Sequence, residues 1–457
     1  MTSRSIYCRQ MLGPGGWASD VLLKTNAAGQ IVSLENGRGE GADLVLTGPV
    51  IPGMPNCHSH AFQRQMAGLA GRPGPHRNDS FWTWREAMYR LANRVSPDDL
   101  ADIARWLYIE MLESGYTSCA EFHYLHHAPD GRDYDPVDET GARLLDAATA
   151  AGIGLTLLPV LYCRSGFGAG SIEPGQVRFA AEPDRFLRLF EHSLDRVKDE
   201  AHHVVGLAFH SLRAVSEAHM SEVLQAEAGR ASSIHIHIAE QRVEVEQCLE
   251  ALGARPVEWL LDHAPANERW CLVHATHMDT GECRSAAQRG VVAGLCPTTE
   301  ADLGDGFFEA GHWQEHGGKI AVGSDSNLRV SPREELRLLE FGLRLRSGRR
   351  NVFGSSGRGC GRDLYEAAAV GGGVALGQAV GRLEAGFRAD LVELDPESPL
   401  LAGVDVEDVV DRYVFAGNKS MVRTVCVGGE QRVYGGRHPQ REEAAEAFSA
   451  VMEDYQQ

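Results

Sequence analysis

The sequence lacks any long hydrophobic run, and it lacks an excess of positive charge. No stretch approaches the 18 or more consecutive apolar residues of a membrane-spanning helix, so no membrane partner is expected. Only 44 basic residues stand against 63 acidic ones, which gives a net charge of −19. An acidic surface repels phosphates and argues against a nucleic-acid partner. No low-complexity segment or long internal repeat is evident, which argues against a disordered or solenoid protein.

Paired cysteines are also missing, since none of the ten forms a CxxC motif. Most of them lie in apolar, strand-like stretches, where a reduced thiol behaves as a small hydrophobic side chain. The first residues, MTSRSIYCRQMLGPGGW, show no apolar core of a secretory signal. We therefore expect a reduced, cytoplasmic protein.

The middle of the chain alternates apolar strand candidates with amphipathic helical stretches. The eight strand candidates are VLTGPVIPG (45–53), YTSCAEFHY (116–124), IGLTLLPVLY (153–162), HVVGLAFH (203–210), SSIHIHIAE (232–240), RWCLVHAT (269–276), VVAGLCPT (291–298) and KIAVGSD (319–325). Eight strand–helix repeats predict an α/β protein with a (β/α)8 TIM barrel over residues 51–374. A doubly wound open sheet is the alternative, because periodicity alone does not distinguish the two.

Short β-like runs occupy residues 1–50 and return after residue 375 as RADLVEL, MVRTVCVGG and QRVYGG. We expect residues 1–50 and 375–440 to form one small β-sandwich domain beside the barrel. The last segment, 441–457, is expected to be a surface helix or a frayed tail.

Metal-competent residues follow four of the strand candidates, at the barrel face where active sites lie. His58 and His60 follow the first candidate, and residues two apart on a strand face the same side. His237 lies near the end of the fifth candidate and His274 near the end of the sixth, and Asp325 ends the eighth. Taken singly, each is commonly an ordinary loop residue or a helix cap. Together they predict a catalytic site for a dication such as Zn²⁺.

Glu240 follows His237 by three residues and can turn back toward a group bound there. A carboxylate beside a metal-bound water is the usual proton carrier in hydrolysis. His235 lies one layer deeper in the predicted barrel, where we expect packing or hydrogen bonding rather than ligation.

Five motifs carry a resemblance to the amidohydrolase superfamily, in its mononuclear deaminase-like branch. They are PGMPNCHSH (52–60), HIAE (237–240), LVHATH (272–277), GSDSN (323–327) and GRLEAGFRADLVELD (381–395). The resemblance implies a metal barrel with a β-sandwich built from both termini. No lysine stands out as the bridging ligand of two-metal members, which favours one metal ion. That ion is expected to be Zn²⁺, with Fe²⁺ or Mn²⁺ as alternatives that similar ligands bind.

The same resemblance implies roles for the polar residues at the strand ends. His58, His60, His237 and Asp325 would be the metal ligands. Glu240 would carry protons, His274 would hold the water or a substrate nitrogen, and Asp325 could share the proton transfer.

Within the branch, the sequence is most similar to the N-formimino-L-glutamate deiminases of histidine degradation. The similarity lies in HAFQRQMAGLAG (60–71), FWTWREAMY (81–89), EFHYLHH (121–127), HSLRAV (210–215) and CPTTEADLGDG (296–306). It implies hydrolysis of N-formimino-L-glutamate to N-formyl-L-glutamate and ammonia, by a homodimer. Asp302 departs from the asparagine expected at its position, which puts a local loop contact in doubt.

A dicarboxylate substrate requires cationic partners, and arginine binds carboxylates bidentately. Arg213 and Arg85 are the first and second candidates, although an arginine is ordinarily a surface ion pair. His210 and Tyr124 could donate to a carboxylate, and Gln63 could contact the formimino group or the glutamate backbone. The rival hypotheses are a deaminase of a purine, pyrimidine or adenosine derivative, and an inactive homologue with a binding role.

Overall fold

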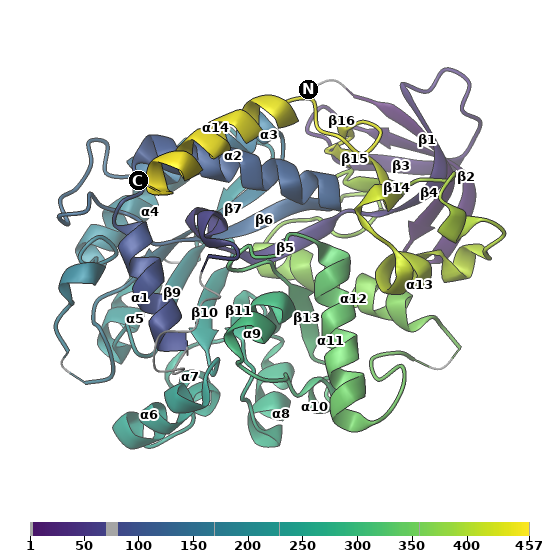
Figure 1. Ribbon diagram of the computed structural model, residues 1–457. Helices are drawn as coiled ribbons and strands as arrows, with labels where there is room; N and C mark the ends of the chain where they lie inside the picture. Colours follow the sequence, from purple (N-terminus) through teal and green to yellow (C-terminus); the bar gives the residue numbers. More distant parts are fainter. Residues whose placement is uncertain (1–2, 70–80, 169, 228, 356, 457) are drawn as a thin grey trace.

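The computed structural model describes residues 3–69, 81–168, 170–227, 229–355 and 357–456 and contains two sheets (Figure 1). The strands of the terminal sheet are β1 (Ser5–Gly13), β2 (Gly16–Thr25), β3 (Ile31–Asn36), β4 (Leu44–Pro52), β14 (Leu391–Leu394), β15 (Val422–Val427) and β16 (Glu430–Val433). The strands of the barrel are β5 (Met54–Ser59), β6 (Tyr116–His123), β7 (Gly154–Leu161), β8 (His203–Val205), β9 (Leu207–Ser211), β10 (Ile234–Ile238), β11 (Trp270–His274), β12 (Val292–Leu295) and β13 (Lys319–Val322). Residues 70 and 71 of the HAFQRQMAGLAG stretch lie outside this description.

The barrel strands pair in parallel in the order β5, β6, β7, β9, β10, β11, β12, β13. The fourth position holds two short strands, β8 and β9, with Gly206 between them. The first and eighth strands meet where Asp325 donates its backbone N–H to His58 O (2.9 Å) and accepts from His60 N–H (3.0 Å). These bonds join the two ends of the sheet, so the predicted (β/α)8 barrel is confirmed and the open-sheet alternative is wrong.

The predicted first barrel strand, residues 45–53, was placed in the wrong sheet. It corresponds to β4, which pairs with β1 in parallel and with β14 antiparallel in the terminal sheet. The first barrel strand is instead β5, which begins one residue after Gly53. A Cβ at Gly53 would lie 2.4 Å from the Thr117 side chain, so the chain crosses between the sheets at a glycine. Two strands separated by a single residue read as one apolar run in the sequence.

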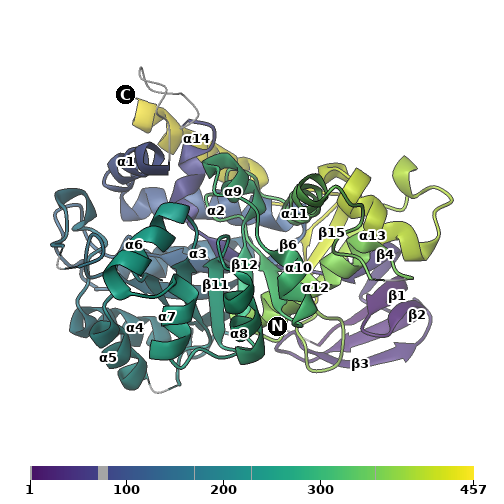
Figure 2. The ribbon, with the colours of Figure 1, turned by 90° about the horizontal axis from the view of Figure 1, so that it is seen from below.

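Helices surround the barrel, and the terminal sheet lies beside it (Figure 2). The α-helices of the described residues are α1 (Phe81–Ala92), α2 (Pro97–Ser114), α3 (Glu139–Ala151), α4 (Pro183–Val197), α5 (Glu217–Glu227), α6 (Arg242–Leu252), α7 (Pro256–His263), α8 (Thr280–Arg289), α9 (Pro297–Leu303), α10 (Ala310–Glu315), α11 (Pro332–Ser347), α12 (Cys360–Leu376), α13 (Val409–Asp411), which lies beside the terminal sheet, and α14 (Arg441–Gln456). The amphipathic stretch 242–263 forms two helices, because Gly253 adopts a left-handed conformation (φ 76°) and Pro256 starts α7. No helix of the described residues is long and apolar enough to cross a membrane.

The terminal sheet is built from both ends of the chain, as predicted. Its central pair joins β4 from the N-terminal part with β14 from the C-terminal part. Ile31 of β3 and Cys426 of β15 lie near opposite ends of the sheet order, yet both belong to one buried cluster. The sheet therefore curves around its own small core.

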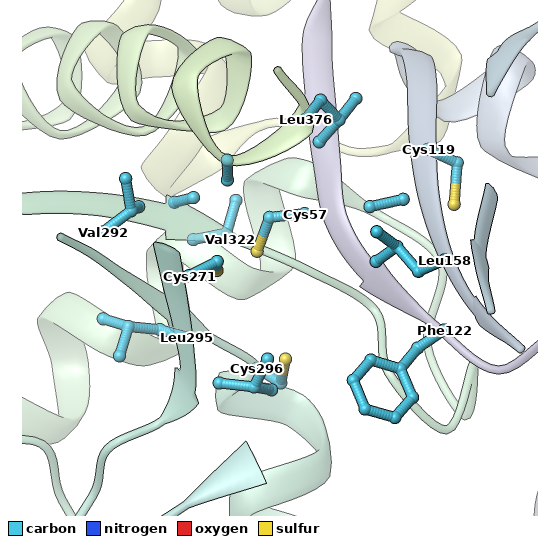
Figure 3. Packing of buried hydrophobic residues seen from close by; sticks show 14 of the residues in the cluster. Cys57, Cys119, Phe122, Leu158, Cys271, Val292, Leu295, Cys296, Val322 and Leu376 are labelled. Atoms are coloured by element: carbon cyan, nitrogen blue, oxygen red, sulfur yellow. The ribbon is translucent and has the colours of Figure 1, made fainter. Parts of the chain in front are cut away.

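The interior of the barrel is filled with aliphatic side chains and thiols. Figure 3 shows Cys57, Cys271 and Cys296 packed among Leu295 and Val322. Nine of the ten cysteines are buried, and all ten are free thiols. They act as small hydrophobic residues, as the strand-like context predicts.

The C-terminal segment forms α14 and packs on α2 (Figure 1). Its Phe448 stacks on Trp106 with ring centroids 6.0 Å apart, and Ala444 and Val451 are buried. The expected surface helix is therefore present, and its apolar face is covered rather than solvated.

Two buried histidines that are not among the predicted metal ligands make the stability of the folded protein depend on pH. Burial lowers the pKa of His126 and of His203 to about 4 each. In the unfolded chain a histidine binds a proton near pH 6.5, so the unfolded state takes up more protons as the pH falls below that value. We therefore expect each histidine to lower the free energy of unfolding by about 2 kcal/mol when the pH falls from 7 to 5.

Urea unfolding at the two pH values measures this loss. Thr149 contacts the ring of His203 at 3.0 Å, and glutamine can keep a contact to this hydroxyl without titrating. His203→Gln should therefore lose less stability between pH 7 and pH 5 than the wild type. Equal losses in the two proteins would contradict the assignment.

Candidate metal centre and substrate pocket

Four ligand-type side chains converge at the C-terminal ends of the barrel strands. His58 is the last residue but one of β5, His60 follows β5, His237 lies in β10 and Asp325 follows β13. The Nε2 atom of His58 lies 3.1 Å from His60 Nε2, 3.1 Å from His237 Nε2 and 3.2 Å from Asp325 Oδ1. One donor atom from each of the four lies within 4.8 Å of the others, and all four side chains are buried.

Hydrogen bonds alone do not account for this cluster. His60 Nδ1 lies 2.9 Å from Phe122 O, and His237 Nδ1 lies 3.0 Å from His210 O. Each ring must carry its proton on Nδ1 to donate to a carbonyl, which leaves a lone pair on Nε2. Lone pairs and a carboxylate that face one point repel each other unless a cation lies between them. The donor set therefore fits one dication held by three nitrogens and an oxygen.

The protonation states of these groups suit a metal. Burial lowers the pKa of His58 to about 3 and also lowers the pKa of His60 and His237. Burial opposes ionisation of Asp325, but the hydrogen bond and charge of His58, with the charges of His274 and His60, hold its pKa below its usual range. Neutral imidazoles and an ionised carboxylate are the forms that bind metal.

The backbone is strained where the strands end. Ala239, His274, Ala275 and Asp325 all have positive φ, between 44° and 66°, although none is glycine. Such conformations persist only where the surrounding structure enforces them, and they are concentrated at functional sites. Here they turn the side chains of Glu240, His274 and Asp325 toward the same space.

Glu240 and His274 lie close to each other beside the four ligand-type residues. His274 Nε2 lies 3.7 Å from Glu240 Oε1 and 3.9 Å from Asp325 Oδ2, and its Nδ1 lies 3.3 Å from Glu300 Oε1. Burial raises the pKa of Glu240 to about 7. Burial opposes the charge on His274, but Glu240, the bond to Glu300 and the charge of Asp325 raise its pKa well above the usual value.

Two acidic residues of this site were not singled out from the sequence. Glu300 contacts His274, and buried Asp305 accepts a hydrogen bond from the side chain of Gln241. Burial and the nearby charge of Glu240 raise the pKa of Asp305 to about 9. Both lie in the CPTTEADLGDG motif, which was the available signal. His235, by contrast, packs below the site and lies 2.7 Å from Ala375 O through its Nε2, as expected.

The residues predicted to bind substrate lie together. Gln63, Arg85, Tyr124, His210 and Arg213 line one cavity, which also reaches His60, His237, Glu240, His274 and Asp325. The apolar walls of this cavity include Trp84, Met88, Tyr89 and Leu303, of which the last three were not assigned to the site from the sequence. Asp302 is exposed on α9, beside the pocket residue Leu303.

Several polar atoms of the cavity are unsatisfied by the described part of the chain. Arg213 is buried, its Nε has no hydrogen-bond partner there, and no carboxylate there lies within 4 Å of its guanidinium. Gln63 donates to Tyr124 OH at 3.1 Å, but its Oε1 has no partner among these residues. The Arg85 guanidinium lies over the Trp82 and Tyr89 rings, 4.4 Å and 5.5 Å from their centroids. Arg85 is half-buried, whereas Arg213 and Gln63 are buried, and buried polar atoms without a partner suit a polar ligand.

Comparisons with known proteins agree with this geometry. The amidohydrolase family model matches residues 50–432. A formimidoylglutamate deiminase of Pseudomonas aeruginosa is 48% identical to this chain over 98% of both chains. A 5-methylthioadenosine/S-adenosylhomocysteine deaminase of Halobacterium salinarum is 26% identical, over 83% of this chain and 80% of the relative. An amidohydrolase structure from Brucella melitensis has a TM-score of 0.93 at 44% identity, covering 99% of this chain and 100% of that one. A zinc-bound adenosine deaminase from Xanthomonas campestris shares the fold, with a TM-score of 0.81 at 20% identity over 99% and 97% of the two chains. The chain belongs to the amidohydrolase family.

Proposed function

We propose that this protein hydrolyses N-formimino-L-glutamate to N-formyl-L-glutamate and ammonia. The observation that carries the proposal is the cavity in which Arg85 and Arg213 face the cluster of ligand-type residues. Two guanidiniums suit a substrate with two carboxylates. The 48% identity to a formimidoylglutamate deiminase over nearly the whole chain supports the same substrate.

We infer that one Zn²⁺ occupies the cluster, held by His58, His60, His237 and Asp325. Nitrogen and carboxylate donors also suit Fe²⁺ and Mn²⁺, so elemental analysis of the purified protein decides the identity of the metal. When bound, such an ion supplies a water that is ionised near neutral pH.

Glu240 and His274 would manage the protons of the reaction. The Glu240 carboxylate accepts a proton from the water that attacks the formimino carbon, and a C–O bond forms. The same carboxyl group, or the His274 imidazolium, then donates a proton to the departing nitrogen. The C–N bond breaks and ammonia leaves. Asp325, 3.9 Å from His274 Nε2, can share this proton.

The far end of the cavity would hold the glutamate part of the substrate. Arg213 and Arg85 would each pair with a carboxylate, while His210 and Tyr124 donate further hydrogen bonds. The free Oε1 of Gln63 can accept an N–H from the formimino group. The apolar walls of the pocket would strengthen these contacts by displacing part of the surrounding water.

Ammonia release tests the proposal directly. Purified protein loaded with Zn²⁺ should release ammonia from N-formimino-L-glutamate, and prior treatment with a chelator should abolish the release. Guanine, cytosine and adenosine derivatives should give none, because a flat ring does not occupy two carboxylate positions. Release from a ring substrate, with none from formiminoglutamate, would contradict the proposal.

Arg164 is expected to position Arg213. Its Nε donates to Arg213 O at 3.1 Å, and its Nη2 donates to Leu212 O and Val215 O at 2.9 Å each. Arg164→Met should loosen this segment and raise KM for formiminoglutamate about 10- to 100-fold, with a smaller change in kcat. Steady-state kinetics measure the split, with the exposed Arg188→Met of α4 as the control. An unchanged KM would show that the segment is held by other contacts.

We infer a role in histidine degradation from the same similarity. The cytoplasmic location and the homodimer stay predictions. Sedimentation of the purified protein decides the second, since a monomeric species would contradict it.

A further inference from the structure

A second cluster of metal-type donors lies away from the substrate pocket. It consists of Cys163, which follows β7, Glu182, which precedes α4, and His219 in α5. One donor atom from each residue lies within 4.8 Å of the other two. His219 Nε2 is 3.8 Å from Glu182 Oε2, which is too long for a hydrogen bond but short enough for two ligands of one ion.

The backbone explains why these three residues meet. Tyr162 and Ala181 form an antiparallel bridge, and Ala181 donates its N–H to Tyr162 O at 3.0 Å. Cys163 and Glu182 each follow one residue of this bridged pair, so both lie close to the bridge, and their donor atoms lie within 4.8 Å of each other. The Cys163 thiol contacts Ala181 O at 3.3 Å, so it is directed toward this bridge. α5 packs against α4 and brings His219 to the same point.

The donor chemistry favours one class of ion. Cys163 is the one cysteine of the ten that is half-buried, and the other nine are buried. A thiolate, an imidazole and a carboxylate together suit Zn²⁺, which takes four ligands and accepts water as the fourth. Mg²⁺ and Ca²⁺ prefer sites made of oxygen alone. Burial and the charge of Glu182 raise the pKa of the Cys163 thiol, Glu222 adds to the rise, and the charge of Arg164 opposes it.

We propose that Cys163, Glu182 and His219 form a second site for Zn²⁺, separate from the cluster in the substrate pocket. Binding replaces the proton of the Cys163 thiol with a sulfur–zinc bond and releases that proton to solvent. The ion would join the end of β7 to α4 and α5. Cys163 and Arg164 both donate their backbone N–H to Ala214 O, at 2.9 Å and 3.1 Å. The site therefore lies beside the segment that carries Arg213.

Alkylation of Cys163 by iodoacetamide, located by peptide mass, tests the site without measuring activity. In the native protein Cys163 should react faster than the nine buried cysteines. At a Zn²⁺ concentration about ten times Kd, about one site in eleven stays free, so alkylation of Cys163 should slow about tenfold. His219→Gln and Glu182→Gln should lose this protection. His192→Gln, which removes an exposed histidine of α4, should keep it.

Cd²⁺ gives an independent signal, because a thiolate bound to Cd²⁺ absorbs in the ultraviolet. The wild-type protein should show this sulfur-to-cadmium band, and Cys163→Ser should lose it while keeping its fold by circular dichroism. A band that persists in Cys163→Ser would assign the sulfur to another residue, such as Cys296 near His274 and Asp325, and would overturn the proposal. Equal alkylation with and without Zn²⁺, or equal protection in His219→Gln and wild type, would overturn it as well.

Discussion

Replacing Glu240 by glutamine is expected to lower kcat for formiminoglutamate about 10²- to 10⁴-fold, while the metal content stays at the wild-type value. The glutamine amide has the shape of the carboxyl group but neither accepts nor releases a proton. Glu240 is not among the four residues of the metal-type cluster, so its change leaves the donor set intact. Burial raises the pKa of Glu240 to about 7, which places it where a group can both accept and donate near neutral pH.

The control for this variant is Glu246→Gln, an exposed glutamate on α6 that should leave kcat unchanged. Metal content by elemental analysis and kcat by ammonia release are measured on the same preparations. An unchanged kcat would remove Glu240 from the proton transfer. A loss of metal in parallel with kcat would give it a role in holding the ion instead.

Much of this site could be predicted because it depends on local geometry. His58 and His60 are two residues apart at a strand end, so the period of a strand places both on one side. The barrel then brings separate strand ends to one face, and this single rule unites His58, His237, His274 and Asp325. Neither step requires knowledge of side-chain packing.

The features that the sequence did not predict depend on contacts between loops. Glu300 and Asp305 reach the site from the segment after β12, and their contacts with His274 and Gln241 follow from how that segment folds over the barrel. The hydrophobic periodicity of a sequence does not indicate which loop residues will contact the strand ends. The change of sheet at Gly53 was hidden for a related reason, since a buried strand in either sheet has the same apolar composition.

Replacing Arg213, which lines the substrate pocket, is also expected to have a large effect on activity. Arg213 is buried, and no carboxylate of the described residues pairs with its guanidinium. An unpaired buried charge destabilises the free protein, and a bound carboxylate of the substrate would remove that penalty. Arg213→Met should lower kcat/KM for formiminoglutamate by about 30- to 5,000-fold, which corresponds to about 2–5 kcal/mol for a desolvated charge pair. The thermal midpoint should stay close to that of the wild type, because methionine fills the space without a buried charge.

Arg178→Met is the contrasting variant. Arg178 is buried but donates to backbone carbonyls of His127 and Ala92, so its role is to hold the fold. Its change should lower the thermal midpoint and leave kcat/KM per folded molecule nearly unchanged. If Arg213→Met instead lost stability and kept its kcat/KM, Arg213 would be a structural arginine of the same kind.

Analogues that lack one charge assign the carboxylate that Arg213 binds. A γ-carboxamide analogue and an α-carboxamide analogue of formiminoglutamate each remove one of the two negative charges. The analogue that lacks the carboxylate bound by Arg213 should be a poor substrate of the wild type, and Arg213→Met should cause little further loss with it. The other analogue should show the full additional loss, because its contact with Arg213 is intact and independent effects add. Full additional loss with both analogues would mean that Arg213 acts on the substrate through neither carboxylate, and the dicarboxylate pocket would have to be assigned to other residues.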